Sequence, residues 1–106
     1  MYQLILFIFL YALALFPVSG QPKYEIRATW LTTLGGMDWP RTKAGSATGI
    51  QRQKKELCNI LDKLQEANFN TVLFQTRLRG DVIYPSALEC FAESLTGHTG
   101  QNPGYD

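Results

Sequence analysis

The sequence contains few of the residues that build metal or redox centres. It has two cysteines, Cys58 and Cys90, and one histidine, His98. No CxxC or His/Cys spacing typical of a zinc site occurs, and His98 lies in a Gly/Thr loop where a solvated side chain is expected. We therefore expect no metal and no cofactor. Two alternatives remain for the cysteines: a disulfide in an oxidising compartment, or Cys58 packed as a small hydrophobe near the apolar face of a helix.

An excess of charge of one sign is also missing. Ten Lys and Arg residues are interleaved with nine Asp and Glu residues, which gives a net charge of +1. This balance leaves no electrostatic footprint for nucleic acid. Gly35-Gly36 lacks the remaining glycines of a nucleotide fingerprint, and the loop 97–104 is interpreted as a connection. We expect no nucleic-acid partner.

The first twenty residues contain no charged side chain. The apolar run from Leu4 to Phe16 is shorter than the roughly 20 residues that a membrane span needs, and it fits the core of a secretory signal. Pro17 ends the run, and Val18 and Gly20 are small enough for the −3 and −1 sites of a signal peptidase. The sequence thus predicts a signal peptide over residues 1–20, and a protein that is exported to the periplasm or secreted.

Two further possibilities concern this leader. The N-terminus lacks the usual positive charge, so an uncleaved anchor is the alternative to cleavage after Gly20. Gln21 stands where a lipoprotein carries its lipidated cysteine, which excludes lipidation at that position. After cleavage, residues 21–106 would form the folded part, with no stable membrane span.

An amphipathic helix is predicted in the middle of the chain. Thr48 and Gln51 fit a capping box that would start it. Asn68 is expected to end it in the left-handed C′ conformation, with Phe69 folding back onto Leu64. The expected apolar face consists of Ile50, Leu57, Leu61, Leu64 and Ala67, and the expected polar side of Gln53, Lys54, Lys55, Glu56, Asp62, Lys63 and Glu66.

Strands are predicted on both sides of this helix, over residues 24–33 and 71–78. Strand, helix and strand make a βαβ unit, whose two strands would be parallel with a right-handed crossover. A parallel sheet is normally covered on both faces and needs more than two strands. No second strong helix and no third strand follow Leu78, so the α/β fold is interpreted as the front end of a larger domain.

Alternation along the second strand places polar side chains near its end. Val72, Phe74 and Leu78, together with Thr76, would face the helix, whereas Leu73, Gln75 and Arg77 would face inward. A buried guanidinium is costly without partners, so Arg77 must meet an acid, a backbone carbonyl or a polar ligand. Long loops leave the C-terminal ends of both strands, where α/β enzymes hold their sites. Arg27, on the first strand, is expected to be an internal ion-pair residue.

Several motifs occur in order along residues 24–106: RATWLTTLGGMDWPR, KKELCNILDKLQEANFN, TVLFQTRLRGDVIYPS and ESLTGHTGQNPGYD. Together they resemble the N-terminal part of the glycosyl-hydrolase-like family 10 proteins, bacterial exported proteins common in Bacteroidetes. The resemblance implies a (β/α)8 TIM barrel, of which this chain would be an N-terminal fragment holding the first βαβ unit. It also implies hydrolysis of glycosidic bonds in an envelope or extracellular polysaccharide, such as peptidoglycan. A non-catalytic carbohydrate-binding barrel is the alternative.

The resemblance also identifies candidate site residues. The strand motif of the family is matched by Gln75, Arg77, Gly80, Asp81, Tyr84, Pro85 and Ser86, and its first loop motif by Gly35, Gly36, Asp38, Trp39 and Pro40. Family members often carry Pro-Trp-Ser where this chain has Cys90-Phe91-Ala92. The residues expected to bind substrate are Gln75, Arg77, Arg79, Asp81, Tyr84, Trp39 and Asp38.

Catalysis needs more than these residues provide. Glycoside hydrolysis usually needs two carboxyl groups. Asp81 is the one candidate here, and its arginine neighbours favour an ionised form that suits hydrogen bonding to sugar hydroxyls more than proton donation. The main acid and base are expected beyond Asp106. For Arg77 and Asp81, the alternative to substrate binding is a salt bridge that pins the loop. Trp39 and Tyr84 could either stack on sugars or pack under their own loops.

Overall fold

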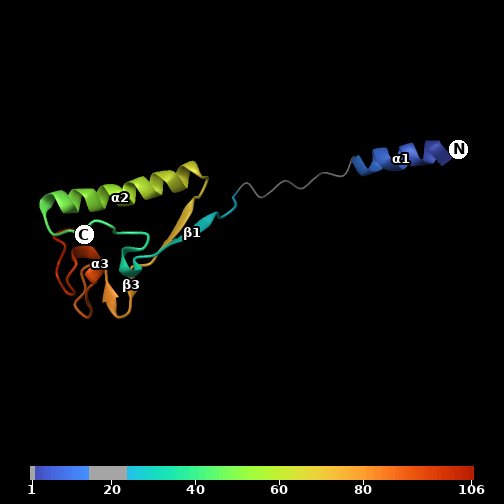
Figure 1. The fold of residues 1–106 in the computed structure, drawn as a ribbon. Helices are drawn as coiled ribbons and strands as arrows, with labels where there is room; N and C mark the ends of the chain where they lie inside the picture. The colour runs from blue at the N-terminus through green and yellow to red at the C-terminus, as the bar shows by residue number, and fades with distance from the viewer. Residues whose placement is uncertain (1, 15–23) are drawn as a thin grey trace.

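The computed structural model describes residues 2–14 and 24–106 (Figure 1). The longest element among them is an amphipathic helix, and most of the strands are short. In chain order, the elements are α1 (Tyr2–Ala14), β1 (Ala28–Leu31), the 3₁₀ helix η1 (Leu34–Gly36), α2 (Ala47–Glu66), β2 (Thr71–Phe74), β3 (Arg77–Leu78), β4 (Asp81–Val82), β5 (Cys90–Phe91) and α3 (Glu93–Thr96).

Helix α1 covers most of the predicted apolar leader. Its 13 residues carry no acidic side chain in the first turn and no basic one in the last, and large hydrophobic side chains such as Leu4 and Phe7 are exposed. Within the described residues, neither this helix nor any other combines the length and apolar character required to cross a membrane. The predicted cleavage site after Gly20 lies outside the described residues.

Strand β1 precedes α2 in the chain and β2 follows it, and the two strands pair in parallel. This confirms the predicted βαβ unit. Their register runs from Ala28 opposite Thr71 to Leu31 opposite Phe74. Both strands are shorter than predicted. The second one ends at Phe74, because the Gln75 N–H makes the last bond to the Leu31 carbonyl, at 2.9 Å.

Arg77 and Leu78 therefore belong to a second sheet rather than to a continuous strand 71–78. In this sheet, which has the order β3-β4-β5, β3 is antiparallel and β5 parallel to β4. A two-residue turn joins β3 to β4, and both of its residues have positive φ: 50° at Arg79 and 80° at Gly80. This is the pattern of a type I′ turn, in which glycine is favoured. The predicted strand was wrong beyond Phe74, because the chain there turns into a hairpin.

Helix α2 begins earlier than predicted. Ser46 is the N-cap, with extended backbone angles, and its Oγ accepts a hydrogen bond from the Gly49 N–H at 3.1 Å. The capping box of Thr48 and Gln51 was wrong, because Ser46 already satisfies the first turn and Thr48 lies inside the helix.

The C-terminal end of α2 confirms the prediction. Asn68 has a φ of 65°. The Phe69 N–H donates to the Leu64 carbonyl and the Asn68 N–H to the Gln65 carbonyl, both at 2.9 Å. These two bonds define a Schellman motif, which satisfies carbonyls that a helix end leaves free.

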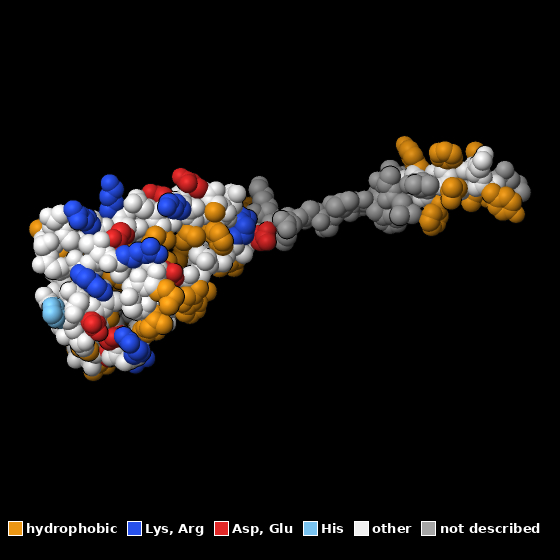
Figure 2. All heavy atoms as spheres, in the orientation of Figure 1, with side chains coloured by type: hydrophobic (Ala, Val, Ile, Leu, Met, Phe, Trp, Pro, Cys, Tyr) orange, Lys and Arg blue, Asp and Glu red, His pale blue; other side chains and the backbone are white. Residues whose placement is uncertain are grey.

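The parallel sheet is covered on one face only. Leu31 is buried and Val72 and Phe74 are half-buried toward α2, as the alternation predicted. On the opposite face, the side chains of Trp30 and Leu73, which are paired in register, are 61% and 51% exposed. Figure 2 shows hydrophobic side chains gathered along the region of β1 and β2.

We predict from this open face that residues 21–106 in isolation do not unfold cooperatively. Two parallel strands and one helix leave Trp30 and Leu73 in water, where burial by further strands would otherwise stabilise them. Circular dichroism should show a broad, shallow thermal change of the isolated segment. A sharp sigmoidal transition of the isolated segment would contradict the prediction.

Candidate functional site

The predicted site residues lie in the loops that leave the carboxyl ends of β1 and β2. Because these strands are parallel, their carboxyl ends meet at one edge of the sheet. The loop after β1 carries Asp38 and Trp39, and the chain after β2 carries Gln75 and the β3-β4 hairpin. The structure thus brings the two predicted motifs to the same end of the βαβ unit.

Gln75 fastens the two strand ends together. The Thr32 hydroxyl donates to Gln75 Oε1, and the Thr33 hydroxyl donates to the Gln75 carbonyl at 2.9 Å. Gln75 is half-buried. Its side-chain oxygen thus links the residues that follow β2 to those that follow β1, and this link holds the starts of the two loops together.

Asp38 and Trp39 hold the loop after β1 in place. Asp38 Oδ2 accepts a hydrogen bond from the Thr32 N–H at 2.9 Å. Trp39 is 4% exposed, its Nε1 donates to the Gln53 carbonyl at 2.9 Å, and its ring meets Phe74 edge-on with centroids 5.7 Å apart. Of the two roles left open for Trp39, this geometry is that of packing under its own loop.

Gln53 is a central residue that the sequence did not reveal. It was expected on the polar side of α2, but it is fully buried, so that expectation was wrong. Its Nε2 donates to the carbonyls of Thr42 at 2.8 Å and Leu95 at 2.9 Å, and its Oε1 accepts from the Tyr105 hydroxyl. Gln53 stands three residues after Ile50 and four before Leu57, and this helical spacing is the one signal that could have placed it inward.

Glu56, one turn further along α2, holds the same loop. Its Oε2 accepts from the backbone N–H groups of Arg41 at 3.1 Å and Thr42 at 3.2 Å, and its Oε1 accepts from the Thr42 hydroxyl. Burial acts to raise the pKa of Glu56, but the hydrogen bonds from Thr42 and Arg41 and the charge of Arg41 outweigh it and leave the pKa below its ordinary value.

Tyr105 completes this cluster from the C-terminal end of the chain. Burial, and then the negative charge of Glu56, raise the pKa of Tyr105 to about 12. The Lys54 ammonium lies over its ring, 4.6 Å from the centroid. The neutral phenol therefore persists as the donor to Gln53 across the physiological pH range.

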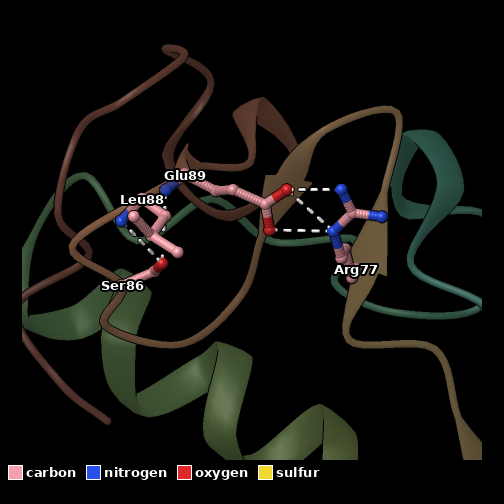
Figure 3. Close-up of polar contacts among 4 residues, drawn as sticks. All are labelled: Arg77, Ser86, Leu88 and Glu89. Atoms are coloured by element: carbon pink, nitrogen blue, oxygen red, sulfur yellow. Dashed lines mark hydrogen bonds and ion pairs between the residues drawn. The ribbon is translucent and has the colours of Figure 1, made fainter.

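Arg77 is paired with Glu89, and Figure 3 shows the geometry. Its Nε lies 2.8 Å from both Oε1 and Oε2, and its Nη2 lies 2.5 Å from Oε1. The prediction that Arg77 meets an acid, a backbone carbonyl or a polar ligand is confirmed by Glu89, but the expected inward burial of the guanidinium and the salt bridge with Asp81 were wrong. Glu89 takes that place because the strand order β3-β4-β5 brings the start of β5 across to β3.

This ion pair is largely on the surface. The Arg77 side chain is 61% exposed and that of Glu89 22%. The hydrogen bond and charge of Glu89 raise the pKa of Arg77, with a smaller contribution from Tyr84. The hydrogen bond from Arg77 in turn lowers the pKa of Glu89. Both groups are therefore charged at neutral pH.

The loop before β5 is shaped so that it presents Glu89. The Ser86 hydroxyl accepts hydrogen bonds from the N–H groups of Leu88 at 3.1 Å and Glu89 at 3.2 Å (Figure 3). Sequence reasoning missed Glu89, because its partner is set by the β4-β5 pairing and not by local spacing. The serine three residues earlier is the only local signal.

The remaining predicted residues differ in their access to solvent. Arg79 is exposed at the tip of the hairpin, and Asp81 is half-buried in β4. Tyr84 is 40% exposed. The hairpin therefore places one aromatic ring and charged groups of both signs at the end of the parallel strands.

The expectations for Arg27 and for the two cysteines were wrong. Arg27 is not internal: it is exposed before β1, with its Nε 2.5 Å from the Asn68 carbonyl and its Nη1 4.0 Å from Glu25. Cys58 and Cys90 are both free and exposed, so the structure shows neither a disulfide nor a buried thiol at these positions. Across residues 2–14 and 24–106, no three His, Cys, Asp or Glu side chains are grouped so that they could hold a metal ion.

Comparison with known proteins matches the family model described as "Glycosyl hydrolase-like 10" over residues 25–106. The chain belongs to this family. It is 37% identical over 91 residues to glycosyl hydrolase YngK of Bacillus subtilis, covering 86% of this chain and 17% of that protein. It is 36% identical over 92 residues to glycosyl hydrolase DigH of Escherichia coli K12, covering 83% of this chain and 20% of that protein.

This glycosyl hydrolase-like 10 segment thus spans about a fifth of the length of the curated relatives it matches. The match covers β1, α2, β2 and the hairpin together, including every predicted site residue. The two motifs gathered at the carboxyl strand ends are therefore parts of one family segment and not separate chance patterns.

Proposed function

We propose that this chain acts as the N-terminal part of an exported glycoside hydrolase built on a (β/α)8 barrel. Its substrate would be an envelope or extracellular polysaccharide, such as peptidoglycan. The observation that carries the proposal is the cluster of polar side chains at the carboxyl ends of β1 and β2, in a segment of the glycosyl hydrolase-like 10 family. In (β/α)8 barrels this is the end at which active sites lie.

The side chains have separate roles in this proposal. Arg77, Arg79 and Asp81 would hydrogen-bond sugar hydroxyls, and Tyr84 would offer its exposed ring to a sugar face. Asp38, Trp39 and Gln75 would act from beneath, because their polar atoms hold the loops that carry the others. The principal acid and base would come from later strands, since hydrolysis normally uses two carboxyl groups placed across the glycosidic bond.

A non-catalytic carbohydrate-binding barrel is the second candidate. One observation favours it: Glu89, a carboxylate at this edge, is engaged by Arg77 and is not free to transfer protons. The two candidates share the sugar-binding rim and differ only in bond cleavage. An assay that measures binding and cleavage separately distinguishes them.

The test uses a chimeric barrel, in which residues 25–106 of this chain replace the matching segment of the Bacillus subtilis relative. Purified peptidoglycan glycan strands serve as the probe. Arg77→Ala should weaken binding about 10-fold or more, because it removes a charge-assisted hydrogen bond to the sugar. Asp81→Ala should have a smaller effect. Affinity would be measured by calorimetry and cleavage by release of reducing ends.

Arg52→Ala is the matched control, because Arg52 is an exposed arginine on α2. It should leave affinity unchanged. Unchanged affinity in Arg77→Ala as well would refute the rim assignment. Binding without cleavage by the chimera, where the parent barrel cleaves the same strands, would favour the non-catalytic candidate.

A further inference from the structure

The Arg77–Glu89 pair leaves one edge of the guanidinium open. Glu89 engages Nε and Nη2 of Arg77. In Figure 3 the third guanidinium nitrogen points away from Glu89, and among the described residues none accepts a hydrogen bond from Nη1. Arginine presents its donors in a rigid planar fork, so fixing one edge also fixes the direction of the other.

We infer that Glu89 is a positioning residue of the sugar-binding rim, which holds Arg77 so that Nη1 and the free edge of the guanidinium face the sugar. This inference rests on the proposed function. Glu89 itself would not touch the sugar: it acts through Arg77.

Burial supports a positioning role over a stabilising one. Glu89 is the sheltered member of the pair and Arg77 the exposed one, as their exposed fractions of 22% and 61% show. Exposed ion pairs contribute little to stability, because water screens the charges and two flexible side chains must be ordered. What the bidentate geometry does provide is a defined orientation of the guanidinium.

The backbone around Glu89 is ordered in a way that suits this role. Ser86 Oγ fixes the N–H groups of Leu88 and Glu89, and the following residues Cys90 and Phe91 pair with Asp81 and Val82 of β4. The backbone is therefore held at Glu89 itself and in the strand that follows, and this fixes where the carboxylate starts from. Arg77 itself lies in β3, held by its pairing with Val82.

A double-mutant cycle in the chimeric barrel tests the inference. Glu89→Gln keeps the size of the side chain and removes its charge, and we expect the KM for peptidoglycan glycan strands to rise about 5- to 10-fold with kcat unchanged. In the Arg77→Ala background the same change should have no further effect, because residues that act through one another are not additive. Glu93→Gln, an exposed glutamate on α3, is the matched control.

A charge swap separates positioning from a merely structural ion pair. Arg77→Glu combined with Glu89→Arg restores opposite charges but moves the guanidinium to the other loop. We expect the KM to stay high in this double variant, with a melting temperature close to that of the unaltered chimera. If the swap restores the KM, or if Glu89→Gln behaves like Glu93→Gln, the inference is overturned.

The outcomes also separate this inference from the proposed function. If Arg77→Ala leaves KM and affinity unchanged, the proposed sugar rim fails. If Arg77→Ala weakens binding but Glu89→Gln adds its own effect in the Arg77→Ala background, only the positioning role of Glu89 fails. If Glu89→Gln lowers the melting temperature, the charge-swapped double variant distinguishes the two roles. Recovery of both the melting temperature and the KM in that variant would show a purely structural ion pair and overturn the inference.

Discussion

Replacing Gln53 by leucine in the chimeric barrel should lower the free energy of unfolding by roughly 2–5 kcal/mol, since each buried polar group left without a partner costs about 1–3 kcal/mol. The change keeps the side-chain volume but removes all three of its hydrogen bonds. The Thr42 carbonyl and the Tyr105 hydroxyl then lose the partner that Gln53 provides, and the Leu95 carbonyl keeps only its bond from the Ala44 N–H.

The loss of these hydrogen bonds should also destabilise segments outside α2. Gln53 ties the loop after η1, helix α3 and Tyr105, the residue before the last, to one point of α2. The Ala44 N–H, which donates to the Leu95 carbonyl at 2.8 Å, lies between two of these segments. Its hydrogen exchange should accelerate, because local opening no longer breaks the bonds to Gln53.

Urea unfolding and hydrogen exchange measure the two effects. Gln51→Leu is the matched control, since Gln51 is exposed on the same helix and its replacement should change stability by less than about 0.5 kcal/mol. An equal shift in Gln51→Leu and Gln53→Leu would show that the buried hydrogen bonds carry no special weight, and the assignment of Gln53 as the central tie would then fall.

The features that local sequence could predict are those with local causes. The helix of residues 47–66 follows from apolar spacing, and its end at Asn68 follows from the left-handed conformation that asparagine tolerates. The parallel pairing of β1 and β2 follows from the helical crossover that joins them.

The features that sequence missed depend on contacts between distant segments. The second strand ends at Phe74, where the chain turns toward the β3-β4 hairpin and the hydroxyls of Thr32 and Thr33, more than forty positions away, engage Gln75. The N-cap at Ser46 is selected together with the packing of Gly49 against Lys43. Neither the end of the second strand nor the position of the N-cap can be read from the spacing of apolar residues.

The candidate site shows the same division. The location of the charged stretch at the strand ends was predicted from the sequence. So was the need of Arg77 for an acid, a backbone carbonyl or a polar ligand, although its guanidinium is 61% exposed and not buried as that argument assumed. The identity of that partner was not predicted: Asp81 is nearer in sequence, but the β4-β5 register brings Glu89 instead. The burial of Trp39 is likewise decided by a bond to the Gln53 carbonyl on another element.

Gly49→Ala should also be strongly destabilising, although alanine is the better helix former. A Cβ atom at residue 49 would lie 2.5 Å from the backbone carbonyl oxygen of Lys43 and 3.3 Å from the Ser46 hydroxyl. Overpacking of this kind typically costs about 1–3 kcal/mol. The gain in helix propensity, about 1 kcal/mol, would offset only part of this cost.

The cost is high here because the Lys43 carbonyl has little freedom to move. The Ala44 N–H donates to Leu95, the Lys43 ammonium donates to the Ser94 carbonyl at 2.9 Å, and Glu56 holds the N–H groups of Arg41 and Thr42. A shift of this loop therefore strains several hydrogen bonds at once. We expect the Gly49→Ala chimera to unfold at a lower urea concentration, with weaker protection of the Ala44 amide.

Gly45→Ala provides the contrast within the same loop. No atom lies within 4 Å of a Cβ at residue 45, and its φ is outside the left-handed range. This substitution should be neutral, or stabilising by about 0.4–1 kcal/mol through the loss of freedom in the unfolded chain. If Gly49→Ala changed the free energy of unfolding as little as Gly45→Ala, the Lys43 carbonyl would have to move aside without cost. Asp38 and Trp39 at its start would then no longer be held by a rigid connection to α2, and their supporting role beneath the proposed rim would be lost.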